Sequence, residues 1–588
     1  MSQTSIDLGA LLPEGLPATA DLVAEARRLA RGVEIGRTLY LQEKGVRSEL
    51  EYRRHAAKHR IPCTAMNIGL ATWADTRDAL ELIYEDALRR GVRAPDRFEL
   101  LAERRMGLPP ELRENAPAET GPCLWTEQDW WELGNTVPIQ PEAGDNMIGG
   151  PGSVPNAIAA LRAGCTTVGV ASQFVWRWPY WDDEAAQIAA VVTAAAILAE
   201  KKAEGAVLNG YIDDGYCGVF ADYATLVGWA MLERYAFEEL LGVPYSVSWG
   251  GLTTNPHNKA VVTLALEAVN PQHIPPAYIQ GDTIGHTDDI AQNYAGVSID
   301  IAMAKLVCVR YGIAGAMIAV PVTENIRIPS WEEIADIQAA NRRVESYLPS
   351  LEKMIDWRAI EVEAARIADG GRTVCANFIE TMRATGVDVS DALQVLLVMK
   401  RIGSDAFERI FGAGAPDPKE LSGRVPLLRT DLVSKTLELR EEVLATVRES
   451  LGVEVLQGRS IVVASTDVHH FALYLMRSVL EQAGADVTDI GVSRDPEDIA
   501  KVAIETDADA VCVTTHNGVA RSFGALLKEA LTADTCRAAV FMGGVLNEDI
   551  EDSPTPVDVR ADLWAQGIQT PEDFPTLIAQ LSKTAARQ

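Results

Sequence analysis

Short apolar runs alternate with longer helical patterns from about residue 60 to about residue 380. Helical stretches lie between several of the runs, such as DDEAAQIAAVVTAAAILAEKKAEG, which ends at Gly205, and NKAVVTLALEAV, which follows Pro256. Strands that alternate with helices predict a parallel sheet, and eight such units over this length predict a (β/α)8 TIM barrel. The candidate strands are PCTAMNIG, TVPIQPEAG, CTTVGVAS, GAVLNGYI, PYSVSWGG, PAYIQGD, GAMIAVPV and TVCANF.

A second alternating region follows a connector. Residues 415–457 carry Pro residues near their start and then a charged helical pattern. After them come the apolar runs GRSIVVAS, DVTDIGV, DAVCVTT and AAVFMGG at tight spacing, which predict a doubly wound, Rossmann-like domain. The expected organisation is an N-terminal helical extension at 1–59, the barrel at 60–414, a linker with a helix at 415–457 and the doubly wound domain at 458–588.

Composition narrows the range of partners. The formal net charge of -30 argues against nucleic acid and anionic membrane surfaces, which select for an excess of Lys and Arg. No window approaches the roughly 20 apolar residues of a spanning helix, and the start of the chain lacks the pattern of a secretory signal. The eight cysteines show no metal-binding or disulfide spacing. We therefore expect a cytoplasmic protein that acts on a small molecule.

Active sites of such barrels lie where the strands end and the βα loops begin. Polar residues stand at many of these positions, and any one of them can instead cap the helix that follows. They are Glu142, Asp145, Gln173, Asn209, Asp213, Trp249, Thr253, Gln280, Asp282 and Glu324.

The first βα turn of the C-terminal domain reads STDVHHFAL, at residues 465–473. Ligands of doubly wound sheets bind at the carboxyl ends of the strands, where this turn lies. A histidine that binds a metal through one ring nitrogen needs a partner for the other, and Asp467 is placed to serve His469 in this way. Asp and His pairs in loops are also commonly structural, so spacing alone leaves both interpretations open.

The domain resembles the cobalamin-binding domain of adenosylcobalamin-dependent mutases, in particular the small subunit of glutamate mutase. The Asp-x-His signature matches at Asp467 and His469, followed by IGV at 490–492, AIETDADAVCV at 503–513 and the FMGG turn. The resemblance implies that His469 is the lower cobalt ligand and that Asp467 orients it. Ala472 replaces the signature glycine, and Thr514 and His516 replace a serine and leucine pair. The implied cofactor-binding residues are Asp467, His469, Ala472, Thr514, His516, Gly518, Gly543, Gly544 and Glu324.

Residues 60–414 distantly resemble the catalytic subunit of the same family, at PIQPEAG, LRAGCTTVGVASQFVWRWPY, EGAVLNGYIDDGYCG and AVPVTENIRIPS. The resemblance implies that Glu324 holds the ribose of the adenosyl group and that Tyr180 lines the substrate pocket. Several family positions differ in this chain. Asn67 and Glu142 replace the arginines that clamp the carboxylates of glutamate, Val320 replaces a lysine, Val170 replaces a carboxylate, and Trp176 replaces a second tyrosine.

The lost arginines change the expected substrate. Neither Asn nor Glu can replace the bidentate fork that Arg offers a carboxylate, so L-glutamate is not expected as the substrate. Acidic Glu142, with Trp176 and other tryptophans nearby, indicates a substrate that carries an amine or an apolar body. Arg177 can hold one carboxylate. The tryptophans can equally be packing or a lid.

The resemblance implies an adenosylcobalamin-dependent carbon-skeleton mutase, and by analogy a homodimer formed through the barrel. The alternatives are a cobalamin-dependent aminomutase that also uses pyridoxal phosphate, a cobalamin methyltransferase, and a cobalamin-binding or sensor protein without mutase chemistry, because one cobalamin module serves all of these.

Overall fold

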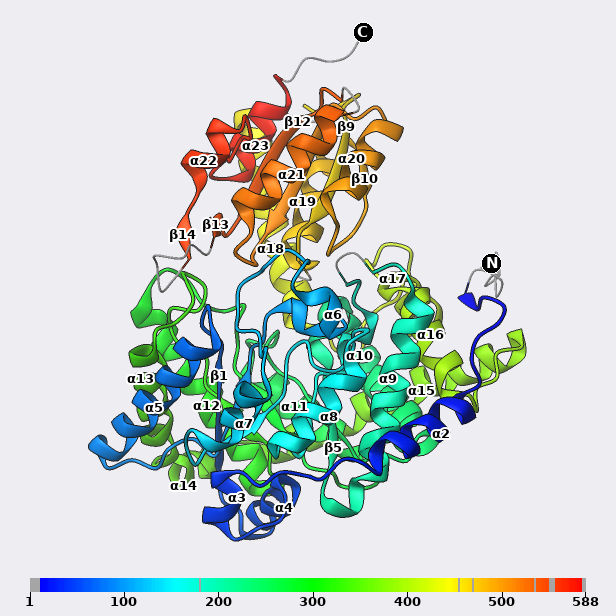
Figure 1. Cartoon of the computed structure of the whole chain (residues 1–588). Helices are drawn as coiled ribbons and strands as arrows, with labels where there is room; N and C mark the ends of the chain where they lie inside the picture. Colours follow the sequence, from blue (N-terminus) through cyan, green and yellow to red (C-terminus); the bar gives the residue numbers. More distant parts are fainter. Residues whose placement is uncertain are drawn as a thin grey trace. The chain divides into compact units, whose positions relative to one another are not determined.

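The computed structural model describes residues 11–178, 181–452, 455–467, 470–533, 536–548 and 556–583 (Figure 1). The chain divides into two compact units. The first takes in the chain up to Asn115, then Gly121–Val175 and Asp183–Asp431. The second takes in the chain from Leu432 onwards and two short earlier segments, Ala116–Thr120 and Trp176–Asp182. The main division falls inside the segment that the sequence predicts as a linker.

Parallel strands form the centre of the first unit. A five-stranded sheet has the order β3-β2-β1-β8-β7, and a three-stranded sheet has the order β4-β5-β6. Isolated parallel bridges, Ala143 with Val168 and Trp249 with Ile279, join the edges of the two sheets. The predicted parallel pairing is confirmed, whereas the closed barrel stays a prediction. The strands are β1 Cys63–Ile68, β2 Arg97–Leu100, β3 Gln140–Glu142, β4 Thr167–Val168, β5 Val207–Tyr211, β6 Tyr245–Ser248, β7 Tyr278–Gln280 and β8 Ala316–Ile318.

Helices follow most of these strands, and their ends agree with local chemistry. The predicted alanine-rich helix is α9, Glu184–Glu200, which Asp183 caps by accepting the N–H of Ala186. The helix predicted after Pro256 is α11, Pro256–Ala268, with the proline in its first turn. The other main helices are α2 Thr19–Ala30, α3 Leu39–Lys44, α4 Glu49–His59, α5 Trp73–Arg90, α7 Glu127–Asn135, α8 Ser153–Ala163, α10 Tyr223–Arg234, α12 Ile290–Tyr311, α13 Trp331–Glu345, α15 Trp357–Thr385, α16 Ala392–Ile402 and α17 Ser404–Phe411.

One of the eight candidate strands is wrong. TVCANF lies inside the long helix α15, where Val374 and Phe378 are both buried at a spacing of four, as on one face of a helix. The strand that the sequence pattern missed is β2. Two of its four residues, Arg97 and Glu99, are charged and yet buried, so the strand lacks the apolar run that marks its neighbours.

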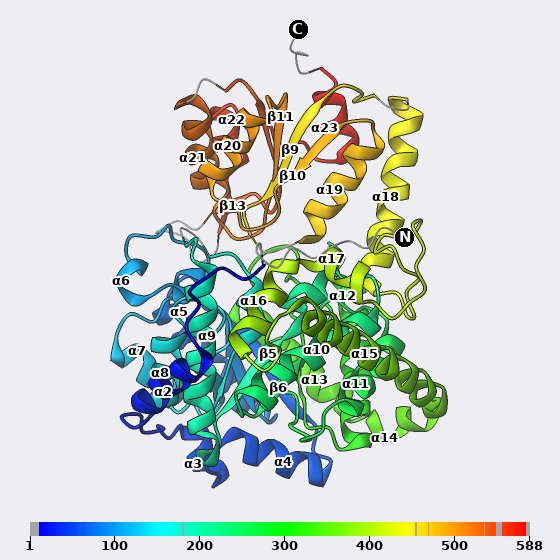
Figure 2. The ribbon, with the colours of Figure 1, turned by 90° about the vertical axis from the view of Figure 1, so that its right-hand side faces the viewer.

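The second unit is a parallel sheet with helices on both faces. Its strands β9 Ser460–Ser465, β10 Asp486–Asp489, β11 Ala510–Thr515 and β12 Ala539–Gly544 have the order β10-β9-β11-β12. Successive residues of β9 and β11 enter two different apolar clusters, one on each face. Figure 2 shows α20 Pro496–Glu505, α21 Ala520–Ala533 and α22 Arg560–Ala565 on one face, and α18 Asp431–Ser450, α19 His470–Gln482 and α23 Phe574–Leu581 on the other. The doubly wound arrangement is as predicted.

None of the helices in the described ranges combines the length and the apolar character that a membrane crossing requires.

Candidate functional site

The carboxyl ends of three strands meet at one edge of the second unit. Thr514 of β11 pairs in register with Ser465 of β9 on one side and with Gly543 of β12 on the other. The strand order reverses between β9 and β11, and ligands of open α/β sheets bind at such a reversal. The row Ser465, Thr514 and Gly543 therefore forms the floor of a candidate binding site.

Asp467 ties the two central loops of this edge together. Its Oδ2 accepts the main-chain N–H of His516 at 2.5 Å and lies 3.7 Å from Nδ1 of the same histidine. Its Oδ1 accepts the Ser465 hydroxyl at 3.3 Å. The side chain is buried, and these contacts hold the loop after β9 against the loop after β11. His469, the predicted metal ligand, lies outside the described residues.

The floor offers space and an unsatisfied hydroxyl. Thr514 is buried, and its Oγ1 has no hydrogen-bond partner in the described part of the chain. A Cβ added at Gly543 would meet nothing within 4 Å, whereas at Gly544, with φ of +100°, it would meet the carbonyl oxygen of Thr515. A buried hydroxyl beside open space is what a bound polar tail requires, so these residues fit the predicted cofactor.

Ala472 and Gly518 flank this edge. Ala472 is a partly buried residue in the first turn of α19. Gly518, with φ of +69°, lies so close to Thr120 that a Cβ there would meet the Thr120 hydroxyl. That hydroxyl donates to the Asn517 carbonyl at 3.1 Å, and Thr120 belongs to the second unit. The structure thus places Asp467, Ala472, Thr514, His516, Gly518, Gly543 and Gly544 in one unit.

Glu142, in the first unit, is already neutralised. Its side chain is completely buried, forms an ion pair with Arg97 through Oε2, and accepts the Asn209 amide at 2.7 Å through Oε1. Arg97 in turn lies 3.1 Å from Glu49 of α4. The sequence analysis took Glu142 as a sign of a substrate that carries an amine. In the structure the group that pairs with Glu142 is the guanidinium of Arg97.

Asn67 lies beside a carboxylate that the sequence analysis did not find. Asn67 of β1 pairs in register with Glu99 of β2, which pairs in register with Glu142 of β3. The Asn67 amide donates to Gln280 Oε1 at 3.3 Å, while its own Oδ1 is buried without a hydrogen-bond partner among the described residues. These side chains form a polar layer near the carboxyl ends of β1, β2, β3 and β7.

Glu99 is a buried carboxylate of this layer with a raised pKa. It is only 2% exposed, and it accepts the Tyr278 hydroxyl at 2.9 Å through Oε1. Burial, with the negative charge of Asp145 nearby, raises the pKa of Glu99 to about 8, against the opposing effects of Tyr278 and Arg97. No sequence signal pointed to it, because β2 was not recognised as a strand.

The remaining predicted residues are divided between the units. Trp176 and Arg177 belong to the second unit, where the Trp176 and Trp178 rings lie 6.0 Å apart. Arg177 forms ion pairs with Asp498, with Asp182 at 3.3 Å and with Asp495 at 3.5 Å. Tyr180 lies outside the described residues. Glu324 belongs to the first unit and is exposed in the turn after β8.

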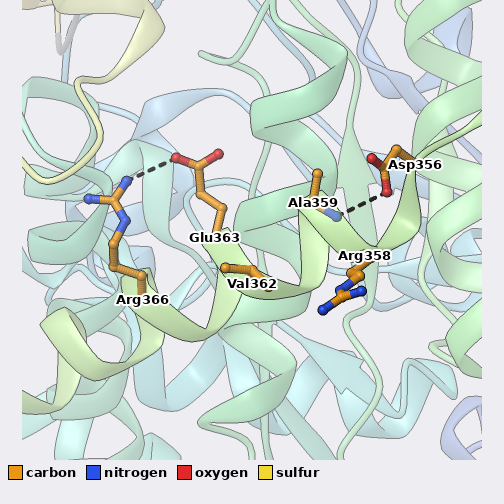
Figure 3. Close-up of a pocket in the computed structure, with 6 residues that line it drawn as sticks. All are labelled: Asp356, Arg358, Ala359, Val362, Glu363 and Arg366. Atoms are coloured by element: carbon orange, nitrogen blue, oxygen red, sulfur yellow. Dashed lines mark hydrogen bonds and ion pairs between the residues drawn. The ribbon is translucent and has the colours of Figure 1, made fainter.

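A surface pocket of about 570 Å³ lies at the start of α15. Figure 3 shows its lining along one helix, with Asp356 accepting the Ala359 N–H and Glu363 paired with Arg366. The lining contains none of the predicted site residues. In the described residues, no group of three or more His, Cys, Asp or Glu side chains is arranged to hold a metal ion.

Comparison with known proteins identifies the kind of domain that contains this edge. Residues 460–559 match the family model described as B12 binding domain, so the C-terminal part carries such a domain and a cobalamin cofactor is supported. A solved structure of a cobalamin-binding protein from Desulfitobacterium hafniense DCB-2 is 16% identical, over 26% of this chain and 71% of that chain, with a TM-score of 0.21. No curated protein matches the chain. The matched segment includes Asp467, Thr514 and Gly543.

Proposed function

We propose that this protein is an adenosylcobalamin-dependent radical isomerase, a carbon-skeleton mutase acting on a small substrate other than L-glutamate. One observation carries the cobalamin part of the proposal. The segment that matches the B12 binding domain contains a floor in which Thr514 Oγ1 is buried without a partner beside the open space at Gly543. The fold alone does not select a chemistry, so the reaction class rests on the resemblance of the first unit to a mutase barrel.

His469 would be the protein ligand of the cobalt, and the Asp467 carboxylate would fix the orientation of its imidazole. Thr514 Oγ1 would donate to the polar tail of the cofactor, and Gly543 would leave room for it. When bound, adenosylcobalamin supplies the radical chemistry that removes and returns a substrate hydrogen. Glu324 would hold the ribose of the adenosyl group.

The first unit would supply the substrate chamber. The two bridges, Ala143 with Val168 and Trp249 with Ile279, continue the two sheets in sequence order, which supports a closed (β/α)8 ring. Polar side chains of β1, β2 and β7 would then face its centre at the end where barrel enzymes bind substrate. These side chains would position the substrate and help to exclude water from the reacting atoms.

The neutralised Glu142 supports a substrate other than L-glutamate. A clamp for two carboxylates needs guanidinium groups that are free to form new hydrogen bonds. The guanidinium that pairs with Glu142 is that of Arg97, which also pairs with Glu49. A dicarboxylate would therefore have to displace an internal ion pair.

The test is anaerobic reconstitution of the full chain with adenosylcobalamin, followed by absorption and paramagnetic resonance spectra. We expect the wild-type spectrum to show a protein imidazole on cobalt in place of the cofactor's own base. His469→Ala should restore that base, while the neighbouring His470→Ala should not. Wild-type protein that binds the cofactor with its own base still on cobalt would rule out ligation by His469.

Candidate amino acids and organic acids are then added to the loaded protein. A paramagnetic cobalt and radical signal with any of them supports the isomerase. A requirement for added pyridoxal phosphate would instead indicate an aminomutase. Tight cofactor binding without a signal from any candidate would favour a cobalamin-binding or sensor protein.

A further inference from the structure

Glu99 takes no part in the ion pairs that join the buried charged residues near it. Arg97 lies between Glu49 and Glu142, and Arg53 lies 3.7 Å from Glu49. Two buried cations thus match two buried anions. Buried charges are costly unless they are paired in this way.

The Glu99 carboxyl has no such cation. Among the described residues no ion pair joins it to a Lys, Arg or His, and its one hydrogen bond is the Tyr278 hydroxyl on Oε1. Asp145 adds negative charge in its vicinity. The second oxygen, Oε2, is left for a donor from outside the network.

A second acceptor lies beside it. Asn67 is the register neighbour of Glu99, and its Oδ1 is buried without a partner in the part of the chain that the structure describes. Neither Asn67 Oδ1 nor Glu99 Oε2 accepts a hydrogen bond from a described residue, and the two lie on adjacent strands, so one group that donates several hydrogen bonds can serve both. An ammonium group donates three, and its positive charge would let the Glu99 carboxyl, whose pKa is raised to about 8 without a ligand, release its proton and pair with it.

The surroundings suit a cation. The Arg97 guanidinium already lies 5.6 Å from the centre of the Tyr278 ring, and the Tyr211 ring lies 5.6 Å from that of Tyr278, so Tyr211 offers the further aromatic face that would attract an ammonium group. Gly144 has no side chain, and a Cβ there would strike the Glu99 side chain. The glycine therefore gives the carboxyl its room.

We propose that Glu99 is the specificity-determining residue of the substrate site, and that with Asn67 it receives an ammonium group, so that the substrate class is a small amine rather than a dicarboxylate. The inference rests on the proposed function only in taking this polar layer as the substrate site. A purely structural Glu99 would keep its proton in the presence of an amine, and glutamine could replace it without effect on ligand binding.

The experiment is a calorimetric titration of the full chain, before and after loading with hydroxocobalamin. The probes are glutarate, L-norvaline and 1,5-diaminopentane, which share one chain length and differ in their charged ends. Wild-type protein should bind the two amines more tightly than glutarate. Glu99→Gln should weaken amine binding by about tenfold or more and leave glutarate unchanged or slightly tighter.

Two further variants keep the result interpretable. Glu99→Asp retains the charge and should bind the amines better than Glu99→Gln, even if both variants are less stable. Glu81→Gln removes one exposed carboxylate from α5 and should behave as wild type. Equal amine affinity in wild type, Glu99→Gln and Glu99→Asp overturns the inference, as does a wild-type preference for glutarate or no binding of either amine.

The amine titration and the cobalamin spectra test different claims, so one can be contradicted without the other. Loss of cobalt ligation or of the radical signal bears on the proposed function and leaves the amine preference standing. Loss of the amine preference leaves cofactor binding untouched.

Discussion

Arg97 and Glu142 form an ion pair between neighbouring strands β2 and β3, and both side chains are almost completely buried. Each member of the pair has a second partner. Glu49 lies 3.1 Å from Arg97, and the Asn209 amide donates to Glu142 at 2.7 Å. Every charge in the group thus has a partner, and Glu142 belongs to the framework of the first unit.

Removal of Glu142 alone should be strongly destabilising. Glu142→Ala leaves part of the Arg97 charge uncompensated in the interior, at a cost of about 3–5 kcal/mol. The measurement is the free energy of unfolding in urea. The double variant Arg97→Met with Glu142→Leu removes both charges and should recover much of the loss. A single variant within about 1 kcal/mol of wild type would contradict the buried pair.

Gly543 and Gly544 should respond differently to alanine. Gly544→Ala forces a side chain into the left-handed region and against the Thr515 carbonyl, which should cost on the order of 1–2 kcal/mol. Gly543→Ala meets open space, so its melting temperature should match wild type while its affinity for hydroxocobalamin falls. Normal cofactor affinity in a stable Gly543→Ala protein would show that the open space does not receive the cofactor.

Thr514→Val tests the unsatisfied hydroxyl. Valine keeps the shape and removes a buried polar group without a partner, so the free energy of unfolding should stay the same or rise by up to about 1 kcal/mol. Affinity for hydroxocobalamin should fall by roughly three- to tenfold, the value of one hydrogen bond. Thr514→Ser keeps the hydroxyl and should bind better than the valine variant. A clear loss of stability on Thr514→Val would mean that the hydroxyl is already satisfied within the protein.

Glu99 should make the stability of the protein depend on pH. Its pKa is about 8 in the folded protein against an ordinary 4.5, so the folded state holds a proton that the unfolded state releases between these values. The stabilisation is complete below about pH 4.5 and is lost as the pH rises through about 8. Plotted against pH, the difference in unfolding free energy between wild type and Glu99→Gln should fall across this window. A flat difference would contradict the raised pKa.

Much of the second unit was predictable because its signals are local. The apolar runs of β9, β11 and β12 enter two cores by simple alternation, and β9 and β11 are each followed closely by a helix. Asp467 comes two residues after the end of β9, so it could be placed at the carboxyl edge from sequence alone. Its contact with His516 could not, because the two residues lie on different loops that only the pairing of β9 with β11 brings together.

The first unit shows the opposite case. The sequence placed Glu142 correctly at a strand end, and it could not show that Arg97 neutralises the carboxylate. It missed β2 and Glu99, because charged residues in a buried strand break the hydrophobic pattern by which strands are recognised.

The sequence by itself determined the alternation of strands and helices, the parallel sheets and the position of Asp467 after β9, since each depends on residues close together in the chain. Only the tertiary structure decided which buried charges are paired and which are not. The ion pair of Arg97 with Glu142, and the lack of a cation for Glu99, depend on the register of strands that are separated by whole helices in the sequence.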